Sequence, residues 1–284
     1  MTTILRTIAE VRRWRTDVGE VAFVPTMGAL HEGHLSLVDA AHREAPWVAA
    51  SVFVNPAQFG PHEDFAAYPR DEEGDVRRLS SREVDAAFIP SVEEIYPPGE
   101  QTRVRVGAIA ERLEGNARPG HFEGVATVVA KLFLIVQPSV ALFGQKDFQQ
   151  LRVVQTMARE LRFPVRVIGC PIVREREGLA RSSRNRHLSA DEREAATVLS
   201  RALFAAQRSF ERGERDAARL RRIVADELRT EPLCETEYVS AADPLTLGEL
   251  DGPAERAVLS LAARFGEARL IDNVLLGMRL EELT

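Results

Sequence analysis

Residues 21–34 decide the expected fold, and they read Val21-Ala22-Phe23-Val24-Pro25-Thr26-Met27-Gly28-Ala29-Leu30-His31-Glu32-Gly33-His34. The first five positions form a short apolar run, as in a strand that is buried on both faces of a parallel sheet. A helical pattern begins at the end of the stretch. The glycines between them permit tight turns, and free N–H groups at a helix start attract anions. The stretch therefore predicts a strand, a phosphate-binding loop and a helix.

Two histidines mark the expected helix start. His31 and His34 are three positions apart, so both rings can face the same bound phosphates. A lone histidine would be interpreted as a structural residue, but the paired spacing at this turn favours a binding role. The chain has no G-x-x-x-x-G-K-[ST] motif of the P-loop enzymes. The helix dipole disfavours positive charge on the rings and phosphate favours it, so their protonation stays open.

Similar apolar runs recur along the next part of the chain, at 48–54, 86–89, 140–143 and 165–168. Segments with helical periodicity separate them, at 34–45, 70–81 and 148–161. This alternation predicts an α/β fold with a doubly wound parallel sheet. Ligands of such sheets bind outside the carboxyl ends of the strands, so the residues that follow each strand are the candidates for chemistry.

The second strand is followed by Asn55 and Gln58, which either line a substrate site or belong to a solvated Pro-Gly turn. Asp64 either helps to hold Mg²⁺ beside phosphate oxygens or caps the next helix. Arg118, before an apolar helix that ends near Val136, is either a solvated loop residue or a ligand for a carboxylate or phosphate.

The fourth strand ends in Gly144-Gln145-Lys146-Asp147-Phe148-Gln149-Gln150. Lys146 stands at the carboxyl end of that strand, and Asp147 or Gln150 can line a pocket from the first helical turn. Farther along, Ser182, Ser183 and Arg184 supply two hydroxyls and a guanidinium, a set that suits triphosphate oxygens.

The sequence pattern changes near residue 189, from short apolar runs to charged amphipathic segments, and this change predicts a second domain. Charged amphipathic helices are expected at 190–211 and 216–228, followed by strands at 236–240, 257–262 and 269–271. We therefore expect domains at 1–186 and 187–284, the second a smaller α+β unit.

Composition narrows the class of protein. The chain of 284 residues is 45% hydrophobic and 28% charged, with a net charge of −6, which argues against broad affinity for nucleic acids. It has no run of apolar residues long enough for a membrane span and no export signal at its start, so we expect a cytoplasmic protein. Cys170 and Cys234 lack metal-ligand spacing and are interpreted as buried thiols.

Lysine is rare in this chain. Of 37 basic residues only Lys131 and Lys146 are lysines, and a lysine retained against such a bias can be needed for its compact ammonium group. Lys131 lies in the apolar helix and is interpreted as a snorkelling surface residue, whereas the position of Lys146 after a strand favours a role in a site.

Together these segments resemble the pantothenate synthetase family over nearly the whole chain. The first loop is of the H-x-G-H class of a wider group of nucleotidyl-transfer enzymes. The resemblance runs from Phe23-Val24-Pro25-Thr26-Met27-Gly28 to Arg269-Leu270-Ile271-Asp272-Asn273. It is narrowed to this family by three segments, Val54-Asn55-Pro56-Ala57-Gln58-Phe59, Gly144 to Gln150 and Ser182-Ser183-Arg184-Asn185. It implies a Rossmann-like, nucleotidyltransferase-like first domain and a homodimer.

The resemblance also implies site residues. His34, His31, Lys146 and Arg184 would be catalytic, Gln58, Gln150, Asn55 and Arg118 would bind substrate, and Asp64 would bind Mg²⁺. ATP would be bound by Met27, Gly28, Ala29, Leu30, His31, Glu32, Gly33, His34, Gly144, Gln145, Lys146, Asp147, Val173, Arg181, Ser182, Ser183 and Arg184. One departure is Arg181, where the family usually has Met or Leu, and the role of its side chain stays open.

The implied reaction belongs to pantothenate and coenzyme A biosynthesis. Pantoate would attack the α-phosphate of ATP to give pantoyl adenylate and pyrophosphate, and β-alanine would then displace AMP. A site rich in His, Lys, Arg and amides suits this chemistry, because it needs positioning and charge stabilisation rather than a protein nucleophile. Two alternatives share the loop and the fold: an adenylyltransferase that leaves AMP on its product, and a nucleotide-binding module without catalysis.

Overall fold

The computed structural model describes residues 2–60, 65–66 and 68–283. These residues group by their contacts into two compact units, each described here by itself. The first unit covers the described part of Met1–Gly144 together with Gln149–Cys170, and the second covers Gln145–Phe148 and Pro171–Leu283. The domain boundary expected after residue 186 stays a prediction.

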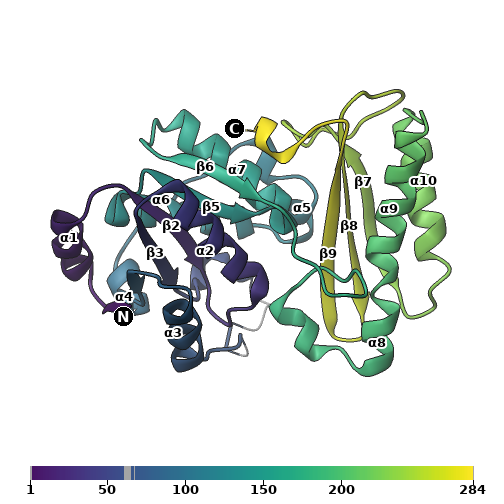
Figure 1. Ribbon diagram of the computed structural model, residues 1–284. Helices are drawn as coiled ribbons and strands as arrows, with labels where there is room; N and C mark the ends of the chain where they lie inside the picture. The colour runs from purple at the N-terminus through teal and green to yellow at the C-terminus, as the bar shows by residue number, and fades with distance from the viewer. Residues whose placement is uncertain (1, 61–64, 67, 284) are drawn as a thin grey trace. The chain divides into compact units, whose positions relative to one another are not determined.

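The first unit contains a parallel sheet whose described part has six strands in the order β1-β4-β3-β2-β5-β6 (Figure 1). The strands are β1 (Thr3–Leu5), β2 (Val21–Thr26), β3 (Trp47–Val52), β4 (Ala86–Phe88), β5 (Val140–Gly144) and β6 (Arg166–Cys170). The predicted doubly wound sheet is confirmed. Only β1, an edge strand of three residues, was not predicted, because it is too short to show periodicity. The strand order reverses between β2 and β5, which is where ligands bind in sheets of this type.

The helices of this unit lie between the strands in the chain. They are α1 (Ile8–Asp17), α2 (Glu32–Glu44), α3 (Glu72–Ser81), α4 (Val92–Ile95), α5 (Glu114–Ala117), α6 (His121–Val136) and α7 (Phe148–Glu160), with short 3₁₀ helices η1 (Pro56–Gln58) and η2 (Ala108–Ala110). The three helices predicted from periodicity correspond to α2, α3 and α7.

Successive side chains of β2 point to opposite faces of the sheet, and both faces are covered. Ala22 and Val24 point into one apolar cluster, which they share with Leu37 and Val38 of α2 and Leu79 of α3. Phe23, which is fully buried, points to the opposite face of the sheet because successive strand residues alternate. The α6 helix contacts β2 as well as α1. An unbroken apolar run was therefore a correct signal for a strand with both faces covered.

The second unit is built on an antiparallel sheet in the order β7-β8-β9. Its elements are η3 (Gln145–Asp147), η4 (Ser183–His187), α8 (Ala190–Ala195), α9 (Val198–Glu211), α10 (Ala217–Leu228), β7 (Glu235–Ala242), β8 (Ala257–Phe265), β9 (Ala268–Leu276) and η5 (Leu280–Leu283). One apolar cluster joins α9 and α10 to the sheet, with Leu203, Leu220, Leu259 and Phe265 fully buried. This is the expected α+β arrangement.

One element of the second unit was predicted wrongly. The single helix expected over 190–211 is two helices, because the chain turns at Ala196 and Thr197 between α8 and α9. The Thr197 hydroxyl donates to the carbonyl oxygen of Glu194 at 2.7 Å. The backbone bonds also change here, since the N–H groups of Thr197 and Leu199 donate to carbonyl oxygens three residues back, those of Glu194 at 3.1 Å and Ala196 at 3.2 Å. Amphipathic periodicity carries no sign of such a switch from α-helical to 3₁₀ bonding.

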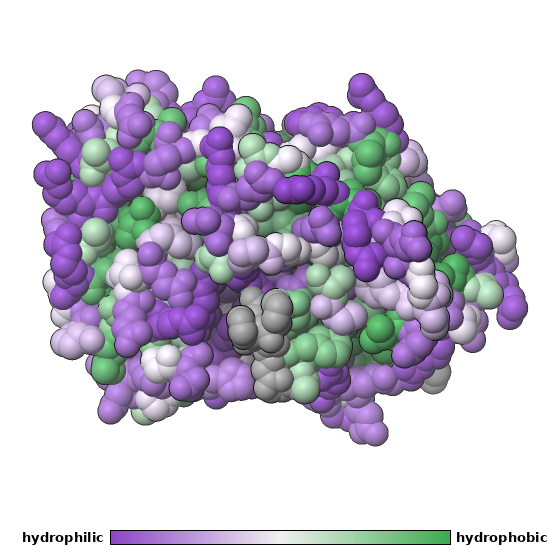
Figure 2. Space-filling model, turned by 180° about the vertical axis from the view of Figure 1, so that it is seen from behind, coloured by the Kyte–Doolittle hydropathy of each residue, from purple (hydrophilic) through white to green (hydrophobic). Residues whose placement is uncertain are grey.

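The surface view in Figure 2 shows hydrophobic residues in small areas separated by hydrophilic ones. In the described part of the chain, the large apolar side chains that are exposed are far apart in the sequence and are Trp47, Leu134, Leu161, Leu233 and Leu245. Among the described residues, no helix is long and apolar enough to span a membrane.

Candidate active site

The loop after β2 has an unusual backbone. Gly28 and Ala29 both have positive φ angles, 82° and 51°. A side chain at Gly28 would collide with Asp75, since a Cβ there would lie 2.8 Å from the Oδ2 atom of that residue. Ala29 holds its conformation against a strain of about 1 kcal/mol. The predicted loop is therefore present, and its shape has to be held by other groups.

Asp75 of α3 holds the loop. Its Oδ2 atom accepts a hydrogen bond from the backbone N–H of Ala29 at 2.8 Å, and its Oδ1 atom accepts one from Leu30 at 2.7 Å. The carboxyl group is buried, and burial raises its pKa while the two N–H groups partly oppose that rise. Asp75 was not predicted, because in the sequence it is one of several acidic residues in the first turn of a helix.

His31 and His34 cap the start of α2 reciprocally. The Nδ1 atom of His31 accepts from the N–H of Gly33 at 3.1 Å, and the Nδ1 atom of His34 accepts from the N–H of His31 at 3.3 Å. The ring centroids lie 4.1 Å apart. Because each Nδ1 accepts, a neutral ring carries its proton on Nε2. The structure thus brings the two predicted histidines together, with Nδ1 of each ring used as an acceptor at the start of α2.

Glu32 begins α2 with its side chain directed elsewhere. Its carboxylate pairs with the Arg82 guanidinium at 3.2 Å. The ATP contact expected of Glu32 stays a prediction.

Asn55 and Gln58 form a pair of amides in and beside η1. The Nδ2 atom of Asn55 donates to Oε1 of Gln58 at 3.0 Å and to the carbonyl oxygen of Gly124 at 3.1 Å. The Nε2 atom of Gln58 lies 3.1 Å from Sδ of Met27, which belongs to the loop after β2. Both amides are buried, so the alternative of a solvated turn is wrong. The structure joins three predicted site residues in one network.

Arg118 reaches this network through a histidine that was not predicted. His121 lies with Nδ1 at 2.9 Å from the carbonyl oxygen of Gln58, so Nδ1 carries the proton and donates. Its Nε2 atom then accepts from Nη1 of Arg118 at 3.1 Å. The Arg118 guanidinium therefore supports the Gln58 backbone through one intervening ring.

In the second unit, Asn273 of β9 holds the segment around Lys146. Its Nδ2 atom donates to the carbonyl oxygens of Gln145 at 2.9 Å and Lys146 at 3.0 Å, and its Oδ1 atom accepts from Nε2 of Gln145 at 3.2 Å. Lys146 is half-buried and Asp147 is exposed. The backbone of the predicted lysine is thus fixed, while Gly144 ends β5 in the first unit.

The segment from Val173 to Asn185 folds back on itself. The N–H of Arg181 donates to the carbonyl oxygen of Val173 at 2.9 Å, and the Ser182 hydroxyl caps η4 by accepting from the N–H of Arg184 at 3.3 Å. Asn185 is buried and donates to the carbonyl oxygen of Ala180 at 3.1 Å. Ser183 is half-buried, and Arg184 is exposed on this folded segment.

A buried ion pair anchors the same segment. Arg174 donates to both carboxylate oxygens of Asp272, at 2.6 and 3.0 Å, and the Asp272 side chain is only 1% exposed. Asp272 also accepts from the N–H of Asn273 at 2.8 Å. One strand of the second unit therefore positions both the Lys146 segment and the Val173 segment.

Two other predicted residues have simpler placements. Gln150 lies on the first turn of α7 and is half-buried. Asp64 lies outside the described residues. Within the part of the chain that is described, no group of three or more His, Cys, Asp or Glu residues could hold a metal ion.

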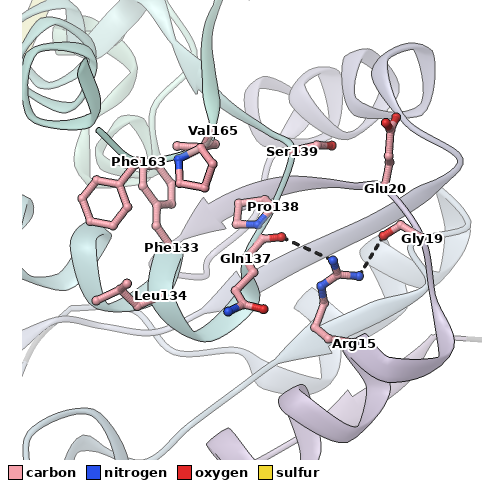
Figure 3. Close-up of a pocket in the computed structure, with 11 residues that line it drawn as sticks. Arg15, Gly19, Glu20, Phe133, Leu134, Gln137, Pro138, Ser139, Phe163 and Val165 are labelled. Carbon is pink, nitrogen blue, oxygen red and sulfur yellow. Dashed lines mark hydrogen bonds between the residues drawn. The ribbon is translucent and has the colours of Figure 1, made fainter. Parts of the chain in front are cut away.

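A pocket of about 470 Å³ lies at the amino ends of the strands of the parallel sheet (Figure 3). Its lining precedes β2, β5 and β6 in the chain, for example at Glu20, Ser139 and Val165, and includes the rings of Phe133 and Phe163. None of the lining residues belongs to the predicted site. The pocket opens at the amino ends of the strands, whereas the candidate residues follow the carboxyl ends.

Comparison with known proteins decides the family. The model of the family described as pantoate-beta-alanine ligase matches residues 3–275. The chain belongs to this family. A pantothenate synthetase of Chloroflexus aurantiacus is 56% identical over 274 residues, covering 96% of this chain and 98% of the relative. Family members are ligases that form a C–N bond, so the resemblance is confirmed, and the protein is an enzyme rather than a binding module.

Solved structures of the pantoate–β-alanine ligase family agree in fold. The pantothenate synthetase of Thermus thermophilus has a TM-score of 0.92 at 50% identity, covering 96% of this chain and 99% of that one. The ligase of Francisella tularensis, whose structure is titled as complexed with beta-gamma ATP and beta-alanine, has a TM-score of 0.80 at 34% identity, covering 97% of this chain and 98% of that one.

The residues that sequence reasoning missed mostly act through backbone. Asp75 and His121 hold loops or helices that carry the predicted side chains, and a residue of this kind has no local motif. Asp272 and Asn273 are different, because both lie in the stretch Arg269-Leu270-Ile271-Asp272-Asn273, which is part of the family resemblance. That stretch is the sequence signal that could have pointed to them.

Proposed function

We propose that the protein condenses pantoate with β-alanine to pantothenate, using ATP and releasing AMP and pyrophosphate through a pantoyl adenylate. The observation that carries this is the family match over residues 3–275. The ligands named for the Francisella relative, ATP and β-alanine, are extended to this chain on the basis of 34% identity over nearly its whole length.

In the first step a carboxylate oxygen of pantoate attacks the α-phosphorus, and the bond to the β-phosphate oxygen breaks to release pyrophosphate. Negative charge grows on the α-phosphate oxygens in the transition state. His34 and Lys146 stabilise that charge, and His31 supports His34. The capping bonds that leave the proton of each ring on Nε2 support these roles, because a donor held in place costs no reorganisation during reaction.

Pantoate binds to Gln58 and Gln150, beside Asn55 and Arg118. Support comes from the buried amide pair, in which Oε1 of Gln58 accepts from Asn55. The Nε2 donor of Gln58 is thereby directed away from Asn55 and suits the oxygens of a hydroxy acid. Arg118 supports the Gln58 backbone indirectly, because it bonds His121, which in turn bonds the Gln58 carbonyl oxygen.

ATP binds along the residues that follow β2 and β5 and along the Val173–Arg184 segment. The loop from Met27 to His34 supplies backbone N–H groups at a helix start, which suit phosphate. Arg184 is exposed and can make a bidentate contact with phosphate oxygens. The nucleotide enters as its magnesium complex, since Mg²⁺ is commonly held by phosphates with one or two carboxylates. Asp64 is the proposed carboxylate.

In the second step the amine of β-alanine attacks the acyl carbon of pantoyl adenylate. The bond between that carbon and the bridging oxygen breaks, AMP leaves with the oxygen, and the amine loses a proton to give the amide. We also propose that the enzyme acts in the cytoplasm as a homodimer, a proposal that rests on the family resemblance.

Isotope transfer tests the reaction. With pantoate whose carboxylate oxygens are a heavy isotope, the AMP released should carry one heavy oxygen, measured by mass spectrometry. ADP as the product, or AMP without label, would contradict an acyl adenylate. An adenylated product that persists when β-alanine is added would instead identify an adenylyltransferase.

A further inference from the structure

Lys131 has no part in the reaction proposed above, and its ammonium group has protein partners that the sequence did not indicate. Its Nζ atom donates to the carbonyl oxygen of Ile95 at 2.5 Å and to Oε2 of Glu100 at 2.5 Å. The same atom lies 4.8 Å from the centroid of the Tyr96 ring. The Glu100 side chain is 13% exposed and that of Lys131 is 25% exposed. Lys131 therefore attaches the segment 95–100 to α6. The partly exposed side chain fits the expected snorkelling residue, but its ammonium group bonds protein oxygens.

Tyr96 continues the connection from Lys131 into the substrate amides. Its hydroxyl donates to Oδ1 of Asn55 at 2.8 Å, and the N–H of Ala57 donates to the same oxygen at 3.2 Å. Burial, helped by the nearby Glu100 carboxylate, raises the pKa of the Tyr96 hydroxyl, so the group is an O–H donor at neutral pH. Two donors thus fix which end of the Asn55 amide is oxygen.

The orientation of Asn55 determines that of Gln58. With Oδ1 of Asn55 held by Tyr96 and Ala57, its Nδ2 atom must face Oε1 of Gln58, 3.0 Å away. The Gln58 amide then has its Nε2 group on the side of Met27. If the Asn55 amide could rotate by half a turn, Gln58 would follow, and it would offer an acceptor where it now offers a donor.

We propose that Lys131 and Tyr96 are positioning residues for pantoate, which hold the Asn55 and Gln58 amides in the one orientation that presents Gln58 as a donor. The inference rests on the proposed role of Gln58. It also accounts for a lysine in an arginine-rich chain. A compact ammonium fits over the Tyr96 ring while it bonds Ile95 and Glu100, and the planar guanidinium of arginine needs a wider space.

The test removes single groups and measures each substrate separately. Tyr96→Phe deletes only the hydroxyl and keeps the ring over Lys131, and Lys131→Met deletes the ammonium and keeps most of the stem. Each should raise the KM for pantoate about tenfold while the KM for ATP changes less than about twofold. Tyr238→Phe, on β7 of the second unit, is the matched control and should change neither value.

Repeating the Tyr96→Phe change in a Gln58→Ala variant shows whether Tyr96 acts by positioning Gln58 or by stabilising the fold in general. If Tyr96 acts through Gln58, then Tyr96→Phe should add no further rise in the KM for pantoate once Gln58 is absent. An unchanged KM in a folded Tyr96→Phe variant would overturn the proposal. Equal losses for all three substrates, or full additivity with Gln58→Ala, would overturn it too. Failure of the proposed function is distinct, because the wild type would then form no pantothenate.

Discussion

Replacing Gly124 by Ala sets two physical effects against each other. Gly124 lies inside α6, where alanine is favoured over glycine by about 1 kcal/mol. However, Gly124 lies where α6 packs against η1, and a glycine there lets the two backbones approach closely. A Cβ at this position would overlap the carbonyl oxygen of Ala57 and lie 2.6 Å from Cα of Gln58. The obstructing atoms are backbone, so they cannot move aside as a flexible side chain can.

The size of the effect follows from this geometry. Carbon atoms pack about 3.5–4.0 Å apart, so α6 and η1 would have to separate by about 1 Å. Overpacking of this kind costs about 2–3 kcal/mol, which exceeds the gain in helix propensity. We expect the Gly124→Ala variant to be less stable by about 1–2 kcal/mol, with a melting temperature lower by about 2–6 °C. Because Gln58 moves with η1, the KM for pantoate should rise about tenfold or more.

Two measurements on one pair of variants check this prediction. Thermal unfolding gives the stability, and steady-state kinetics give the KM for pantoate and for ATP. The matched control is Gly19→Ala, at a glycine whose added Cβ would meet no atom within 4 Å. The control should leave both quantities nearly unchanged. A Gly124→Ala enzyme that melts at or above the wild-type temperature, with an unchanged KM for pantoate, would refute the close contact of α6 with η1.

Other predictions concern the second unit and a buried thiol. Lys146→Ala should slow adenylation by about 10²-fold, because one preorganised charge is lost. A single-turnover rate within a few-fold of the wild-type rate would show that Lys146 has no role in the adenylation step. Arg184→Lys should reduce kcat/KM for ATP more than Arg181→Met, which should cost less than about tenfold, since lysine lacks the planar fork and position 181 is usually Met or Leu in the family. The reverse order would mean that the wrong arginine has been assigned to phosphate. Burial raises the pKa of the Cys170 thiol to about 11, so the folded protein should resist alkylation there at about pH 8, and rapid labelling seen by peptide mass spectrometry would contradict its burial.

Much of the fold was predictable because its signals are local. The apolar run in β2 and the glycines and histidines that follow it predict a strand, a turn and a helix start, and the structure has all three. The break between α8 and α9 was not predictable, because both sides of it carry the same amphipathic periodicity. At the break, the N–H groups of Thr197 and Leu199 bond carbonyl oxygens three residues back rather than four.

The site was predictable to the extent that its residues follow strands. Asn55 and Gln58 were candidates for that reason, but sequence could not decide between a solvated turn and a buried pair. That choice depends on Tyr96 and on Gly124, which are distant in the chain. The partner of the Lys131 ammonium group was not predictable for the same reason, because Glu100 lies 31 residues away.

The measurement that tests the central claim most directly is exchange of labelled pyrophosphate into ATP. The two-step reaction predicts exchange that requires pantoate and proceeds without β-alanine, because the adenylate forms before the amine acts. His34→Ala should lose most of this exchange while it remains folded. Exchange that needed β-alanine, or that proceeded equally without pantoate, would contradict formation of a pantoyl adenylate by this enzyme.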